Sequence, residues 1–323
     1  YVPNARLAVA MSLGTCSAKR PGTRPPEAGE SNVMTGPDNI GIVYNSGIPR
    51  AELLAHQLAE KLGLGDSSWV LPTAEMEGQG LSPSTTLIIT VGGDGTILRA
   101  AQLAAPREIP LLGINLGRVG FMTELGADEA VSRVGEYLDG QAWVEERTML
   151  QARVVSERAK DAAAVPFQAL NDVVVGRASV SRLVHLEVRI DGALFTTYRA
   201  DAVIVATATG STGYSISAGG PILHPQSRDL LLNPLATHLG LGTALVLSPD
   251  SVVEVTIRSD YQAVLSIDGR TDLALDPGGT VEVKRSPYIA RFLRSHPPNH
   301  FYVTLTERLS PDARSTGPRV PST

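Results

Sequence analysis

The pattern of apolar and polar positions divides the chain into two parts. Up to about residue 140, short apolar runs alternate with segments in which leucine and alanine recur every three or four residues. Such runs are typical of strands buried on both faces of a parallel sheet, and such recurrences are typical of helices packed against it. The alternation predicts an α/β domain with a doubly wound parallel sheet at residues 38–140. Its predicted strands are 39–44, 68–71, 86–91 and 110–115, and its helices begin at Pro49, near Ile97 and near Asp128.

Beyond Gly140 the helical periodicity nearly disappears, and short β-branched runs separated by turn residues take its place. Asp191-Gly192 is a hairpin signal, because both residue types tolerate a positive φ. We therefore predict a mainly β domain at residues 141–290. A last strand-like piece within 291–309 would return to the first domain. The predicted strands are 149–155, 170–175, 183–190, 193–199, 202–206, 244–247, 252–258, 263–267, 280–284 and 300–309.

The two ends of the chain have neither periodicity. Residues 1–37 contain turn and coil chemistry such as Arg20-Pro21-Gly22, and residues 310–323 are rich in Pro, Ser and Arg. We interpret both as disordered segments. The first credible strand follows Met34 by a few residues, so we expect Met34 to be the natural start and the preceding residues to be an extension.

Composition excludes several classes of protein. The 323 residues are 43% hydrophobic and 19% charged, which is ordinary for a globular protein with a sizeable core. A net charge of −5 argues against nucleic acid as a partner. Since Cys16 is the single cysteine, neither a disulfide framework nor a thiolate zinc site is possible within one chain. No apolar run reaches the roughly 18 residues of a membrane helix. We expect a cytoplasmic protein with no membrane partner.

The first chemical signal is Gly92-Gly93-Asp94-Gly95-Thr96, between a buried strand and a helix. Glycines at such a junction let backbone N–H groups approach an anion at the helix N-terminus. A carboxylate would repel a phosphate, so Asp94 makes most sense facing a hydroxyl or a phosphate-bound Mg²⁺. A Walker loop and a dinucleotide fingerprint are both excluded, because no Lys-Ser or Lys-Thr pair follows Gly95 and Leu98 stands where the fingerprint needs a small residue. A tight turn with Asp94 as a mere cap is the alternative reading.

Two further signals follow. Asn115 to Phe121 reads NLGRVGF, in which Gly117 and Gly120 permit close backbone approach and Phe121 offers an aromatic face. Arg199 to Pro221 reads RADAVIVATATGSTGYSISAGGP. Its density of small and hydroxyl residues is poor material for a core but suits the wrapping of a polar ligand. A core aromatic and a flexible Gly/Ser loop are the respective alternatives.

With LNDVVV at residues 170–175, these motifs resemble those of the NAD kinase family, in the same order, over residues 39–285. The long TGSTGYS block is highly specific, whereas GGDGT also occurs in lipid kinases and phosphofructokinases. The resemblance implies an N-terminal α/β domain, a β-rich NAD-binding domain and an active site between them. It also implies phosphoryl transfer from ATP, or from polyphosphate, to the adenosine-ribose 2′-OH of NAD, with Mg²⁺ or another divalent cation.

The resemblance assigns roles to individual residues. Asp94 would contact the 2′-OH, where a carboxylate can act as general base. Gly92, Gly93, Gly95 and Thr96 would surround the phosphates, and Phe121 would lie against the dinucleotide. Asn171 and Asp172 would bind the adenosine part of NAD. The remaining predicted binding residues are Arg199, Asp201, Thr212, Gly213, Tyr214, Ser217 and Asp268. A hairpin turn at Asp268-Gly269 explains Asp268 equally well.

Several positions depart from the family pattern. Asp172 replaces a glutamate that is one methylene longer, Ala208 replaces a proline, and Thr243-Ala244 replaces Arg-Pro. These changes do not touch Asp94, and they bear on the donor site and on the subunit contacts. A homodimer or homotetramer formed through the β-rich domain is expected, because short strands with open edges are usually covered. A lipid or sugar kinase that shares only GGDGT, or a non-catalytic dinucleotide sensor, is the competing function.

Overall fold

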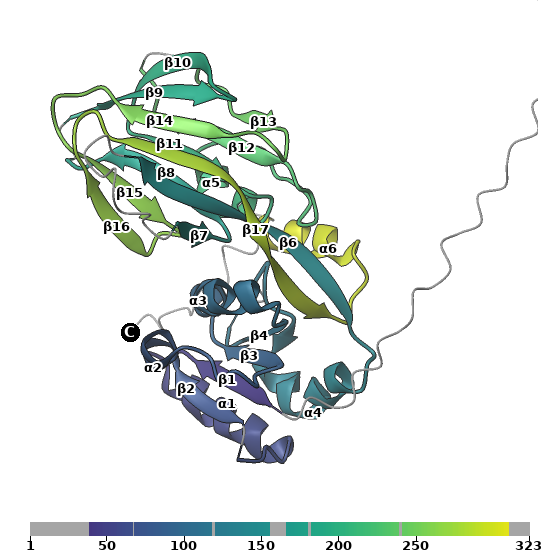
Figure 1. The fold of residues 1–323 in the computed structure, drawn as a ribbon. Coiled ribbons are helices and arrows are strands. Elements are labelled where there is room, and N and C mark those ends of the chain that lie inside the picture. Colours follow the sequence, from purple (N-terminus) through teal and green to yellow (C-terminus); the bar gives the residue numbers. More distant parts are fainter. Residues whose placement is uncertain are drawn as a thin grey trace, which may run out of the picture. The chain divides into compact units, whose positions relative to one another are not determined.

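The structure is a computed structural model that describes residues 39–309 apart from 67, 118–119, 156–165, 180–181 and 239–240 (Figure 1). The predicted extension, the predicted tail and the expected start at Met34 lie outside these residues. So do Arg118 and Val119 of the NLGRVGF motif.

Four parallel strands form the centre of the N-terminal part (Figure 1). Their order is β2 (Trp69–Pro72), β1 (Ile40–Tyr44), β3 (Leu87–Val91) and β4 (Leu111–Asn115), and β5 (Leu125–Gly126) also pairs with β4. Every residue of β1, β3 and β4 is buried. This burial explains why these strands are continuous apolar runs in the sequence.

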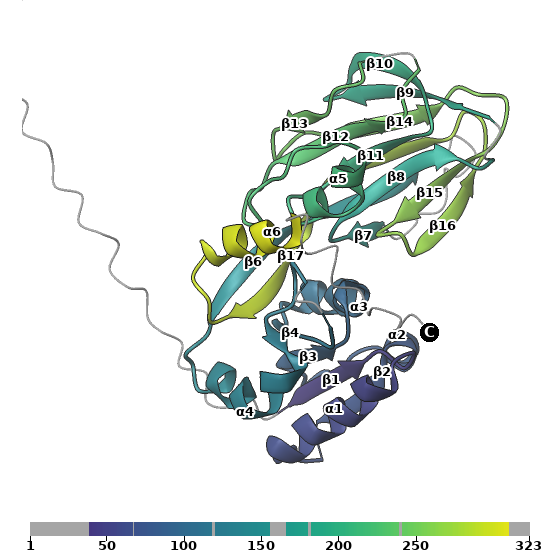
Figure 2. The ribbon, with the colours of Figure 1, turned by 180° about the vertical axis from the view of Figure 1, so that it is seen from behind.

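Helices cover both faces of this sheet. On one face, α1 (Pro49–Lys61) and α4 (Ala127–Leu138) share a core with Ile42. On the other face, α2 (Thr73–Gln79) and α3 (Asp94–Ala104) share a core with Val43, and the short η1 (Ala105–Arg107) follows α3. Successive residues of a strand point to opposite faces, so Ile42 and Val43 belong to different cores. Figure 2 shows α1 lying along β1 and β2.

A single long strand extends the sheet into the C-terminal part. β17 (Thr280–Arg294) is parallel to β4 at Phe292 and antiparallel to β6 (Trp143–Val155) and to β14 (Val253–Ile257). Beyond β14 lie β9 (Val184–Ile190) and β10 (Ala193–Ala200), and β7 (Phe167–Ala169) pairs with β6. The boundary that we predicted near residue 290, between the β domain and the segment returning to the first domain, falls inside β17.

A second sheet of six antiparallel strands packs on these strands. Its order is β13 (Leu245–Leu247), β12 (Leu230–Leu235), β11 (Ala202–Ala206), β8 (Asp172–Arg177), β15 (Ala263–Ile267) and β16 (Thr271–Leu275). Val173 and Val175 of β8 share one core with Leu186 and Val188 of β9. Two short helices, η2 (Gly210–Thr212) and α5 (Tyr214–Ser217), follow β11 (Figure 2). The predicted fold class, α/β followed by mainly β, is confirmed.

The last element differs from its prediction. Residues 300–309 were predicted as a strand but form helix α6 (His300–Leu309). Their aromatic and β-branched side chains favour strands by propensity, which tertiary packing overrides. The Phe301 ring lies 6.3 Å from that of Phe121 and 5.5 Å from that of His224, and Thr304 is buried. Helix α2 and strands β5, β7, β12 and β16 were not predicted.

Candidate active site

The GGDGT loop joins the end of β3 to the start of α3. The predicted helix began near Ile97, whereas α3 begins at Asp94, so this aspartate lies in the first helical turn. A carboxylate is favourable there, because the helix dipole is positive at its N-terminus. Any other residue in place of Gly92 would force neighbouring atoms to move, since its side chain would overlap the Thr96 hydroxyl. Thr96 is buried, whereas Gly93 and Gly95 are exposed.

The Asp94 carboxylate is held in a desolvated position. Among the described residues, one of its oxygens is buried without a hydrogen-bond partner, and the Met122 N–H donates to the carboxylate. A side chain on Gly120 would overlap this carboxylate, so glycine is required there. Burial raises the pKa of Asp94, although the charges of Arg308, Arg147 and Arg294 lower it in part. A carboxylate in this state is a better proton acceptor than an ordinary aspartate.

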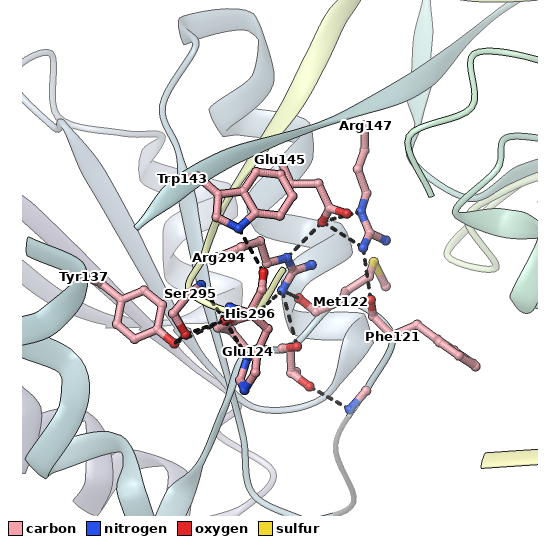
Figure 3. A network of polar contacts seen from close by, with 12 residues as sticks. Phe121, Met122, Glu124, Tyr137, Trp143, Glu145, Arg147, Arg294, Ser295 and His296 are labelled. Atoms are coloured by element: carbon pink, nitrogen blue, oxygen red, sulfur yellow. Dashed lines mark hydrogen bonds and ion pairs between the residues drawn. The ribbon is translucent and has the colours of Figure 1, made fainter. Parts of the chain in front are cut away.

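Two buried arginines hold the segment 120–124 that touches Asp94 (Figure 3). Arg147 donates to the Phe121 carbonyl at 3.2 Å, and Arg294 donates to the Met122 carbonyl at 3.0 Å. Glu145 lies between them and accepts from Arg147 at 2.9 Å and from Arg294 at 2.8 Å. Burial alone would raise the pKa of Glu145, but the two arginines hold it below its ordinary value.

The outer side of this network is formed by Glu124. It pairs with Arg294 at 3.2 Å and accepts from the Ser295 N–H at 2.8 Å, and the Tyr137 hydroxyl also donates to it (Figure 3). Sequence reasoning missed this network, because Glu145 and Arg147 alternate along β6 as residues on a solvated face do. The hydrogen bonds from Arg147 and Arg294 to the Phe121 and Met122 carbonyls explain why the segment 120–124 stays close to Asp94.

A second predicted cluster forms where β8 begins. Asp268 accepts from the backbone N–H groups of Leu170, Asn171 and Asp172 at 3.0, 2.8 and 3.1 Å. Asp268 and Gly269 have φ values of 52° and 64°, so they also form the predicted hairpin turn between β15 and β16. Asp268 Oδ1 therefore positions Asn171 and Asp172, and Oδ2 holds Leu170. A direct contact of Asp268 with a ligand stays a prediction.

The hydroxyl-rich block wraps around this cluster. The Thr207 N–H donates to the Asn171 carbonyl at 2.9 Å, and a side chain on Gly210 would overlap that carbonyl. The Tyr214 N–H donates to Asp172. Burial and the nearby charge of Asp268 raise the pKa of Asp172 to about 7. Among the described residues, the buried Asn171 Oδ1 and Thr209 Oγ1 have no hydrogen-bond partner.

The other predicted residues are spread around these two clusters. Gly213 adjoins Asn171 and Asp172, the Thr212 hydroxyl donates to the Thr209 carbonyl, and Tyr214 and Ser217 are exposed. Arg199 and Asp201 make their contacts with residues outside these two clusters. The Arg199 carbonyl accepts from the His238 N–H at 2.8 Å, and Asp201 pairs with Arg177 at 3.2 Å. Phe121 packs against α6.

Helix α3 links the two clusters. Asp94 is its first residue, and near its end Gln102 donates to the Gln168 carbonyl at 3.2 Å and accepts from Arg270 at 3.3 Å. Arg270 follows the Asp268 turn directly and also pairs with Glu77 on α2. The two groups of predicted residues are therefore connected through one rigid element.

A pocket of about 280 Å³ opens beside the exposed glycines of the GGDGT loop. Arg99 and Arg270 line it, and both pair with the single carboxylate of Glu77. Two guanidinium groups on one carboxylate leave a net positive charge. Together with the N-terminus of α3, this charge suits the binding of an anion. The other lining residues are Asn45, Ser46, Thr73, Ala74, Gly93, Gly95 and Thr96.

Comparison with known proteins places this geometry in a family. Residues 79–142 match the ATP-NAD kinase N-terminal domain and residues 170–295 match the ATP-NAD kinase C-terminal domain. An NAD kinase of Dehalococcoides mccartyi is 43% identical over 274 residues, which cover 84% of this chain and 95% of that protein. An NAD kinase of Chloroflexus aggregans is 45% identical over 223 residues, 69% of this chain and 80% of that protein.

Solved structures agree with these matches. An Archaeoglobus fulgidus NAD kinase in complex with ATP is similar with a TM-score of 0.65 and 27% identity, over 86% of this chain and 100% of that chain. Yeast NADH kinase complexed with NADH has a TM-score of 0.74 over 89% of this chain and 91% of that chain, and at 24% identity it supports the fold alone. The chain belongs to the NAD kinase family.

Proposed function

We infer that the protein is an NAD kinase, which transfers a phosphoryl group from ATP, or from polyphosphate, to the adenosine-ribose 2′-OH of NAD and so forms NADP. The observation that carries this inference is the Asp94 carboxylate, which is desolvated, has a raised pKa and stands at the N-terminus of α3 between glycines. A secondary hydroxyl is a poor nucleophile at neutral pH, so transfer to it gains from a base at this position.

The reaction follows from this placement. As the 2′-oxygen attacks the terminal phosphorus of the donor, Asp94 takes the proton from the hydroxyl. The bond between that phosphorus and the bridging oxygen breaks, and ADP leaves with the electron pair when ATP is the donor. Asp94 then releases the proton to solvent. Positioning of the two substrates supplies most of the remaining acceleration.

We assign the substrates to the two clusters. The donor phosphates lie at Gly92, Gly93, Gly95 and Thr96, beside the pocket with Arg99 and Arg270. NAD is bound at the second cluster. Its contacts come from Phe121, Asn171, Asp172, Arg199, Asp201, Thr212, Gly213, Tyr214, Ser217 and Asp268. The unpartnered Asn171 Oδ1 and Thr209 Oγ1 support a polar ligand there, because buried polar atoms are normally hydrogen-bonded.

A divalent cation such as Mg²⁺ fits this site only as a companion of the donor. The described residues contain no group of three or more His, Cys, Asp or Glu side chains that could hold a metal. Mg²⁺ commonly keeps its water and is bound through substrate phosphates with one or two carboxylates. Asp94 is the carboxylate available at the phosphate site, and the cation would neutralise charge on the donor phosphates.

The direct test is NADP formation by the purified protein from NAD with ATP and Mg²⁺. Polyphosphate in place of ATP, and NADH in place of NAD, define the donor and the acceptor. Formation of NADP that requires protein, donor and cation supports the proposal. The absence of NADP with either donor, from folded protein, contradicts it.

We further propose a homodimer or homotetramer in the cytoplasm. In the described part of the chain, β10 and β13 end their sheets, and each exposes an apolar side chain, Leu194 and Val246. An exposed apolar edge strand is a template for pairing with another chain. No helix among the described residues is long and apolar enough to span a membrane. Light scattering at micromolar protein should give two or four times the chain mass, and a monomer at full activity would contradict the proposal.

A further inference from the structure

The side-chain amide of Gln102 joins the helix that begins at Asp94 to the cluster around Asp268. Its nitrogen donates to the Gln168 carbonyl at 3.2 Å and to Asp268 Oδ2 at 3.5 Å. Its oxygen accepts from Arg270 at 3.3 Å. Gln102 is half-buried and lies outside every sequence motif. Both hydrogens of the amide nitrogen and its carbonyl oxygen are therefore directed at residues in or beside the second cluster.

The two groups that accept from Gln102 control how the chain enters this cluster. Gln168 belongs to β7, which leads directly into the cluster, and its side chain accepts from the Ser286 hydroxyl of β17 at 2.7 Å. Asp268 Oδ2, which accepts from Gln102, also accepts from the Leu170 N–H at 3.0 Å. Gln102 therefore contacts both the strand that enters the cluster and the turn that holds its backbone.

Helix α3 transmits this contact to Asp94. Asp94 and Gln102 are eight residues apart, which corresponds to about 12 Å along a helix axis. Between them Ile97 and Ala101 are buried in the core against the sheet, so the helix moves as one body. The ion pair of Glu77 with Arg270 also links these helices to the cluster, but its side chains are 33% and 21% exposed. Exposed ion pairs contribute little.

We propose that Gln102 is a positioning residue for phosphoryl transfer, which fixes the distance and direction between Asp94 and the acceptor sugar bound at the second cluster. This inference rests on the proposed function. Since the Gln102 amide is engaged within the protein, it acts through α3 and β7 and not by touching a substrate. Proton removal and in-line attack need the hydroxyl and the carboxylate in one defined geometry, and a misplacement of about 1 Å can lower the rate about 100-fold.

The test compares Gln102→Met and Gln102→Glu with wild-type enzyme. Methionine keeps an unbranched chain and loses the hydrogen bonds. Glutamate keeps an acceptor for Arg270 and loses the donors to Gln168 and Asp268. We expect both variants to lower the turnover number between about tenfold and 100-fold. The Michaelis constants for NAD and ATP should stay unchanged, because each cluster keeps its own contacts and only the transition state needs their relative placement.

Gln262→Met is the matched control. Gln262 donates to Asp276 at 3.0 Å, so this variant also loses a hydrogen bond between glutamine and aspartate, at the end of the β15–β16 hairpin opposite Asp268. We expect it to keep wild-type turnover. Calorimetry with NAD alone, and with a non-hydrolysable ATP analogue alone, should give wild-type affinities for the Gln102 variants. Thermal unfolding monitors packing, and Gln102→Glu decides the outcome if Gln102→Met melts below the assay temperature.

Three results would overturn the proposal. They are wild-type turnover in either folded Gln102 variant, weaker binding of either substrate alone, and an equal loss of turnover in Gln262→Met. Weaker binding would place the effect of Gln102 inside one cluster and not between the two. A wild-type protein that makes no NADP would instead contradict the proposed function, so the two failures are distinguishable.

Discussion

Asp94 and Asp172 are both carboxylates whose pKa is raised first by burial, yet their surroundings are opposite. Asp94 stands among the charges of three arginines, which favour its ionised form. Asp172 stands beside Asp268, whose charge disfavours ionisation, and its pKa reaches about 7. Desolvation alone therefore does not define the state of an aspartate in this site. The neighbouring charges leave Asp94 able to accept a proton and Asp172 able to hold one.

Replacing Asp94 by asparagine should have the largest effect, because it removes the carboxylate that accepts the proton. Asparagine keeps the shape and loses the basicity, and general-base contributions are about 10²–10⁴-fold. We expect the turnover number of Asp94→Asn to fall at least ~100-fold, measured as NADP formation. Since burial disfavours the Asp94 charge, the melting temperature should not decrease. Near-normal turnover would remove Asp94 from the role of base, and the surface change Asp128→Asn is the control.

The raised pKa of Asp172 should make the stability of the protein depend on pH. The pKa of Asp172 is raised from 3.8 to about 7, so the folded protein retains a proton that the unfolded chain releases between these values. The associated stability is present below pH ~4 and is lost as the pH rises through about 7. Asp172→Asn cannot titrate. Relative to wild type it should gain on the order of 3 kcal/mol in free energy of unfolding between pH 5 and pH 8.5.

Urea unfolding at both pH values measures this difference. The exposed Asp66→Asn is the control, because surface substitutions change stability by about 0.5 kcal/mol or less. A difference between Asp172→Asn and wild type that is the same at both pH values would show that Asp172 stays ionised.

The smallest expected effect concerns the aromatic side chain of the second cluster. Tyr214 is 45% exposed, while its N–H is fixed to Asp172. Stacking of a nucleobase on an aromatic ring is commonly worth about 1–3 kcal/mol. Tyr214→Ala should therefore weaken NAD binding about tenfold and ATP binding less, as measured by calorimetry. Unchanged NAD affinity would leave Tyr214 with a packing role.

Most of the fold could be predicted because the buried parallel strands are continuous apolar runs and the outer strands are bounded by turn residues. The exceptions have physical causes. The prediction stopped at Lys284, whereas β17 continues through Arg285, Ser286 and Pro287, where the register with β6 shifts. β12 contains Pro234, which usually argues against a strand. At Pro234 it pairs with β11 only, because β13 pairs no further than Leu232.

The parts of the site that lie within sequence motifs were predictable. The parts that are assembled by packing of distant segments were not. The GGDGT loop and the block after Thr207 are local patterns, and the structure gathers each of them around an aspartate. Glu145, Arg147 and Arg294 carry no local signal, because they meet only when β6 and β17 pair. Arg308 was hidden for a different reason, since its helix was predicted as a strand. Contacts between distant segments decide all four positions.

The path of β17 has a consequence for synthesis of the protein. β4 is buried and central, yet the strand beside it, around Phe292, is made about 180 residues later, as the numbering of Leu111 and Phe292 shows. A ribosome that has released the first 140 residues has released a sheet with an uncovered edge. Domains generally fold in order of synthesis. Here β4 cannot pair with β17 until nearly the whole chain has emerged. A nascent chain stalled near residue 280 should therefore be more sensitive to protease in its N-terminal part than one that extends past Arg294.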